Sequence, residues 1–191
     1  MPDDNPLAER GRALEDDYFR KKDRELVDKM RQASAAEVAR QELSAKSGVQ
    51  DPQILQELQA LGFTSETVAL LPLVPLVQMA WAEGGVSDGE RKLILQLART
   101  RGIEEGSAAD RQLAAWLSSR PDPQVFSNAF RLIRATLESA PPGVVPLTAD
   151  DLVKYCEQIA AASGGMFGIN RISSEERALL STIARDLARK A

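Results

Sequence analysis

The stretch AWAEGGVSDGERKLILQLAR (residues 80–99) decides the fold, because it ends one helix, turns at a glycine pair and opens a second helix. An altered copy, AAASGGMFGINRISSEERALLSTIAR, spans residues 160–185. Both copies contain a small-residue helix end, Gly-Gly, an apolar residue and then Ser-x-x-Glu-Arg. One residue separates the glycine pair from the serine in the first copy, and seven do so in the second. This internal repeat predicts two related helix–turn–helix halves.

Signals for helix ends recur along the chain and predict an all-α fold. Ser-x-x-Glu capping patterns begin at Ser34, Ser87 and Ser173, and Asp-Pro pairs at 51–52 and 122–123 are typical of helix starts. Convincing strand patterns are absent from the sequence. Pro72 and Pro75 should break or kink the helix that contains them. The predicted helices span 7–32, 35–46, 52–61, 65–83, 88–101, 108–119, 123–139, 149–163 and 174–190.

Composition narrows the classes of function. The chain has no histidine, the most common general base and transition-metal ligand, and its one cysteine excludes an internal disulfide and a multi-cysteine zinc site. Cys156 lies in an apolar-periodic helix and is predicted to be a buried, inert thiol. A net charge of -4 argues against nucleic acid as a partner. There is neither an apolar run of about 18 residues nor a secretory signal, so we expect a cytoplasmic protein without a membrane span.

Two regions differ in their charge and apolar content. Residues 1–46 form a charged helical arm, in which 21 of 46 residues are charged, and residues 50–191 form the predicted compact domain. In the arm, large apolar residues recur at steps of seven and four, which places them on a narrow stripe of a helix. We expect this stripe to contact another protein, with self-association as the simplest alternative. Its candidate contact residues are Tyr18, Phe19 and Leu26.

The first turn allows two interpretations. In the structural one, a glycine supplies the left-handed residue, Ser87 caps the next helix, and the acids interact favourably with the helix dipole. In the functional one, Glu83, Asp88 and Glu90 bind Ca²⁺ or Mg²⁺ together with carbonyls near the glycine pair. The spacing is not that of an EF-hand. Metal-assisted catalysis by these three acids is the least favoured hypothesis, because the turn offers no nucleophile.

The first turn resembles that of the tellurite-resistance TerB-like family, which usually reads Ala-Asp-Gly-x-apolar-x-x-x-Glu. Glu83 takes the place of the aspartate, and the matching residues are Ala82, Gly84, Val86 and Glu90. The resemblance covers about residues 65–190. It implies a compact helical domain of two related halves, acidic residues associated with divalent-cation binding, and a role in a stress response.

The second turn departs from that family pattern. Ser163 stands where the acid is expected, and Arg171 lies in the longer loop, although Glu176 is retained. We therefore predict that this turn has lost its ion. Met166 and Phe167 are instead candidates for a contact surface, with packing into the core as the alternative.

A second, shorter resemblance concerns the arm. LEDDYFRKKDREL (residues 14–26) is similar to the inhibitory segment of mitochondrial ATPase-inhibitor proteins, and Glu15, Tyr18, Phe19 and Arg20 are the matching positions. The sequence thus predicts first a non-enzymatic helical interaction module that is a candidate for divalent-cation binding. The alternative is a regulatory inhibitor of a partner ATPase that acts through the N-terminal helix.

Overall fold

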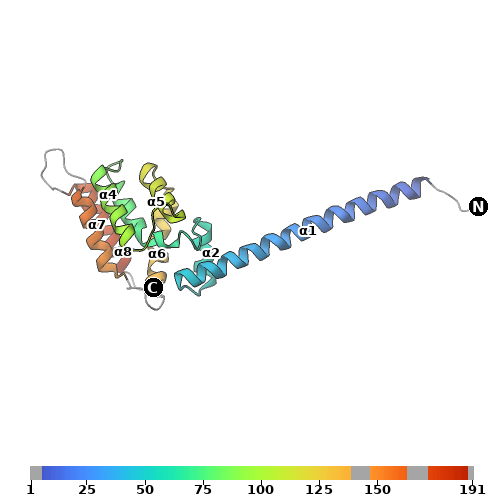
Figure 1. Ribbon diagram of the computed structural model, residues 1–191, viewed down its shortest axis with the longest axis horizontal. Helices are drawn as coiled ribbons and strands as arrows, with labels where there is room; N and C mark the ends of the chain where they lie inside the picture. Colours follow the sequence, from blue (N-terminus) through green and yellow to red (C-terminus); the bar gives the residue numbers. More distant parts are fainter. Residues whose placement is uncertain (1–5, 139–146, 163–171, 189–191) are drawn as a thin grey trace, which may run out of the picture. The chain divides into compact units, whose positions relative to one another are not determined.

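A computed structural model describes residues 6–138, 147–162 and 172–188, and every regular element in these ranges is a helix (Figure 1). The all-α prediction is therefore confirmed. The elements are α1 (Pro6–Ser47), α2 (Pro52–Ala60), the 3₁₀ helix η1 (Val68–Leu73), α3 (Val74–Ala80), α4 (Asp88–Thr100), α5 (Ala108–Ser118), α6 (Pro123–Glu138), α7 (Ala149–Ala162) and α8 (Ser174–Ala188).

Most helix starts coincide with the predicted caps. The Asp51 carboxylate accepts hydrogen bonds from the backbone N–H groups of Gln53 and Ile54, and Pro52 occupies the first turn, where no intrahelical N–H partner is needed. Ser34 is the exception. The predicted helices 7–32 and 35–46 are one helix of 42 residues, so the predicted break there is wrong. Ser34 is flanked by alanines, the strongest helix formers, and no glycine or proline lies in the preceding residues 12–33 to end a helix there.

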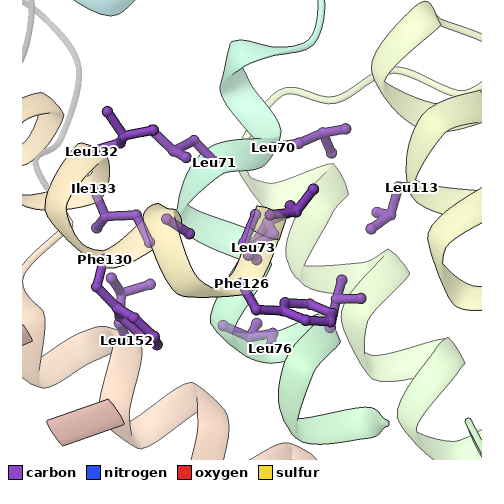
Figure 2. Packing of buried hydrophobic residues seen from close by; sticks show 14 of the residues in the cluster. Leu70, Leu71, Leu73, Leu76, Leu113, Phe126, Phe130, Leu132, Ile133 and Leu152 are labelled. Atoms are coloured by element: carbon purple, nitrogen blue, oxygen red, sulfur yellow. The ribbon is translucent and has the colours of Figure 1, made fainter. Parts of the chain in front are cut away.

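The prolines divide the predicted helix 65–83, as expected. Pro72 lies inside η1, and Pro75 lies in the first turn of α3, where its missing N–H removes no helical hydrogen bond. Six of the seven residues of α3 are buried, so this short helix lies in the core. It packs against α6, α7 and α8, while α4 packs against α7. Figure 2 shows leucines of η1 and α3 together with Phe126 and Phe130 of α6 in this core.

The chain divides into two compact units, residues 1–41 and 42–191. The second unit therefore includes the last turn of α1, which the sequence had assigned to the arm. Leu43 and Val49 are buried in its core, and the Ser44 hydroxyl donates a hydrogen bond of 2.7 Å to the Val49 carbonyl. Across the described residues, no helix combines the length and the apolarity that a bilayer crossing requires.

Candidate functional site

The first repeated turn is closed by a reciprocal capping box. Gly84 adopts a φ of 85°, a left-handed conformation that favours glycine, and Ser87 then caps α4. The Ser87 hydroxyl accepts a hydrogen bond from the Glu90 backbone N–H at 3.3 Å. In return, Oε2 of Glu90 accepts hydrogen bonds from the Ser87 backbone N–H at 2.7 Å and from the Ser87 hydroxyl at 2.8 Å.

The second turn opens α8 with the same pair of contacts. Oε2 of Glu176 accepts a hydrogen bond from the Ser173 backbone N–H at 2.7 Å, and the Ser173 hydroxyl accepts one from the Glu176 backbone N–H at 3.1 Å. The repeated Ser-x-x-Glu pattern thus produces the same local structure twice. Superposition of the complete helical hairpins stays a prediction.

Both capping glutamates are buried, which is unusual for a residue that is charged at neutral pH. Glu90 is 3% exposed and Glu176 is 1% exposed, and they are the only buried acidic or basic side chains that the structure describes. The second carboxylate oxygen of Glu176, Oε1, is buried and has no hydrogen-bond partner. A buried oxygen without a partner is energetically costly, so this atom is a polar anomaly at the second turn.

The two turns influence each other electrostatically. Burial raises the pKa of Glu90, hydrogen bonds from Ser87 lower it, and the carboxylates of Glu176 and Glu83 raise it further. The start of α4 also approaches the end of α7. A Cβ atom on Gly89 would lie 2.7 Å from the Ala162 carbonyl oxygen, so glycine permits the approach. The packing therefore brings the start of α4 close to the end of α7, which precedes the second turn.

The three predicted cation ligands, Glu83, Asp88 and Glu90, do not share one environment in the structure. Glu83 and Asp88 are exposed, whereas Glu90 is buried and engaged with Ser87. In the part of the chain that the structure describes, no three His, Cys, Asp or Glu residues are grouped as a metal ion would require. Glu176, in the turn predicted to have lost its ion, instead helps to raise the pKa of Glu90 through its negative charge. The signal for this pair was the repeated capping box itself.

The other candidate surface lies on α1. Tyr18, Phe19 and Leu26 are 58%, 61% and 57% exposed. The rings of Tyr18 and Phe19 contact each other edge to face with centroids 5.8 Å apart, and the Lys22 ammonium lies 5.8 Å from the Tyr18 centroid. Every exposed large apolar side chain that the structure describes belongs to this helix: Tyr18, Phe19, Leu26, Val27, Met30 and Val38.

Two further candidates have different outcomes. Cys156 is completely buried, and burial raises its pKa to about 12, which disfavours the reactive thiolate. The prediction that it is buried is confirmed. Met166 and Phe167, the predicted contact residues of the second turn, lie outside the described residues.

Comparisons with family models, curated proteins and solved structures gave no match to this chain. The functional hypotheses therefore depend on the α1 stripe and the two buried capping glutamates.

Proposed function

We propose that this chain is a non-enzymatic helical interaction module whose binding element is the exposed part of α1. The exposure of six large apolar side chains on one helix carries this proposal. Phe19, Leu26 and Met30 follow at steps of seven and four, so they share one face of the helix and form a row of anchors. The second unit buries its own large apolar side chains, so the exposed ones are confined to α1 among the described residues.

A photo-crosslinking amino acid tests the proposal. It replaces Phe19 in one variant of the full chain and Lys21, on the opposite face of α1, in the control. We expect a defined crosslinked protein product from position 19 and little from position 21. Equal amounts of product from both positions, or no product from position 19, would refute the proposal that this face of α1 binds a protein. A product that contains an ATPase would favour the inhibitor alternative and would be followed by an assay of ATPase inhibition.

The second candidate function is binding of a divalent cation between the two repeated turns. The buried, unpartnered Oε1 of Glu176 supports it, because a cation would satisfy this atom, and Glu90 contributes a second buried carboxylate. Hard cations such as Ca²⁺ and Mg²⁺ prefer such oxygen ligands. In this form of the hypothesis, Glu90 and Glu176 are the principal ligands, and the exposed Glu83 and Asp88 add negative charge nearby.

Calorimetric titration of the full chain with Ca²⁺ and with Mg²⁺ tests this second function. Glu176→Gln should abolish saturable binding, whereas Glu175→Gln, at the exposed neighbouring position, should leave it within about twofold. Circular dichroism of both variants verifies that the fold persists. If the wild-type chain binds neither ion at millimolar concentration, the two glutamates are helix caps only.

A further inference from the structure

We propose that the partner of the α1 stripe is a second copy of this chain, paired antiparallel along α1 about a two-fold axis between positions 24 and 25. This inference rests on the proposed function and identifies its partner. The stripe of Phe19, Leu26 and Met30 also contains charged residues, and their order determines which pairing is possible. Lys22, Asp23 and Glu37 lie on the same face, at helical spacings of three, four and seven from these anchors.

A parallel pair in register is disfavoured by these charges. Each residue on the stripe would face its own counterpart, so Lys22 would oppose Lys22, Asp23 would oppose Asp23 and Glu37 would oppose Glu37. Like charges at the centre of a helix pair are destabilising, and three such contacts would interrupt a short row of apolar residues. An antiparallel pair avoids this arrangement.

In the antiparallel pair, position i of one copy lies opposite position 49 − i of the other. Phe19 then faces Met30 of the second copy, and the two-fold axis makes this apolar contact twice. The two Leu26 side chains lie three residues apart near the axis, or about 4.5 Å along the helix. Lys22 lies about one helical turn from Asp23 of the second copy. Asp23 lies opposite Leu26 of the second copy, and the nearby Lys22 of that copy offsets its charge. The pairing thus places apolar residues together at both ends of the row and opposite charges near its centre.

The length of α1 selects the same register. Position 6, where α1 begins, lies opposite position 43, and Leu43 is the first buried residue of α1 among those whose side chains the structure describes. Residues 6–43 of each copy therefore cover one another from end to end. Residues 6–41 contain nine basic and eight acidic residues, so two copies carry little net charge to repel each other.

Variants of the full chain with one added cysteine test the orientation. Phe19→Cys and Met30→Cys are oxidised separately and as an equal mixture, and the products are identified by mass spectrometry. We expect the mixture to yield a 19–30 disulfide dimer at least about tenfold faster than either variant alone. Identical positions would lie eleven residues, or about 16 Å, apart along the helix, too far for a disulfide. The wild-type chain is the blank, because its Cys156 is buried.

Sedimentation of the full chain at concentrations up to a few hundred micromolar provides the second measurement. We expect a dimer whose dissociation constant rises at least about tenfold in Leu26→Gln and less than about twofold in Lys21→Gln, on the opposite face. Self-linking of each cysteine variant as fast as the mixture would overturn the antiparallel pair, and so would a monomer at all concentrations. If the chain is a monomer but still crosslinks to another protein through position 19, the dimer is refuted and the proposed function as an interaction module is retained. A monomer without any crosslink would remove both proposals.

Discussion

The exposed segment of α1 and the second unit contain the same kind of secondary structure, but different forces stabilise it. Helices of the second unit bury an apolar face, and α3 is buried on almost all sides. Residues 17–39 of α1 are exposed throughout, so their helix depends on intrinsic propensity and on local pairs such as Arg40 with Glu37. Helix content alone therefore does not indicate a core. The location of the large apolar side chains separates a stabilising region from a binding region.

The largest effect on stability should come from truncating the chain at different points near the boundary between the two units. A chain that begins at Gln41 should remain folded, because it keeps the buried residues of the second unit. A chain that begins at Gln50 should lose most of its stability, since it lacks Leu43 and Val49, which are 0% and 2% exposed. Removing one buried leucine or valine costs roughly 1–5 kcal/mol, a large part of the stability of a typical domain. Thermal unfolding followed by circular dichroism compares the two chains, and equal melting temperatures would contradict the boundary at 41/42.

A matched pair of leucines tests the same contrast without truncation. Leu76→Ala in α3 should lower the free energy of unfolding by about 2–5 kcal/mol, because Leu76 is 0% exposed and its removal leaves a cavity. Leu26→Ala in α1 should change it by less than about 0.5 kcal/mol, as is usual at the surface. Urea unfolding measures both values. A comparable loss in Leu26→Ala would mean that the stripe contributes to the core.

Two glycines of the first repeated turn allow the effect of close packing on stability to be compared within the second unit. Gly89→Ala should destabilise the chain by about 1–3 kcal/mol, because the new Cβ would lie 2.7 Å from the backbone oxygen of Ala162. Gly85→Ala is the control. Its Cβ would meet nothing within 4 Å, so its effect should be small. Urea unfolding again gives the difference, and a neutral Gly89→Ala would show that α4 and α7 separate easily.

Much of the fold was predictable because helix ends depend on local sequence. Asp51 and Ser87 cap helices where their side chains reach backbone N–H groups two or three residues ahead. Ser34 shows the limit of this rule. Its Ser-x-x-Glu pattern matches a cap, but no helix-ending residue precedes it, and α1 continues.

The candidate site was only partly predictable, because burial depends on packing between distant segments. Glu83, Asp88 and Glu90 are close in sequence, yet only Glu90 is buried. The association of Glu90 with Glu176 arises from helices that lie far apart in the chain and pack together as α4, α7 and α8. The exposed apolar residues of α1 were predictable for the opposite reason, because a stripe that is too narrow for a core helix is visible in the sequence alone.

The smallest expected effect concerns the buried charge of Glu90. Since its pKa is raised above 4.5 in the folded chain, the folded chain keeps a proton at pH values at which the unfolded chain has released it. This group's contribution to stability is therefore most favourable below pH 4.5 and declines as the pH rises through the raised pKa. Glu90→Gln removes this decline and retains a side chain that can complete the capping box. The free energy of unfolding should thus fall less between pH 4.5 and pH 7 in the variant than in the wild-type chain.

Urea unfolding at several pH values measures that difference, and Glu37→Gln on α1 controls for the loss of one negative charge. Glu37 is exposed, so replacing it removes a charge that water already solvates. If Glu90→Gln and Glu37→Gln alter the pH dependence equally, the effect comes from net charge and not from burial. If only Glu90→Gln alters it, the second unit differs from α1 in one more respect: it keeps a carboxylate in an apolar core, where folding and protonation are coupled.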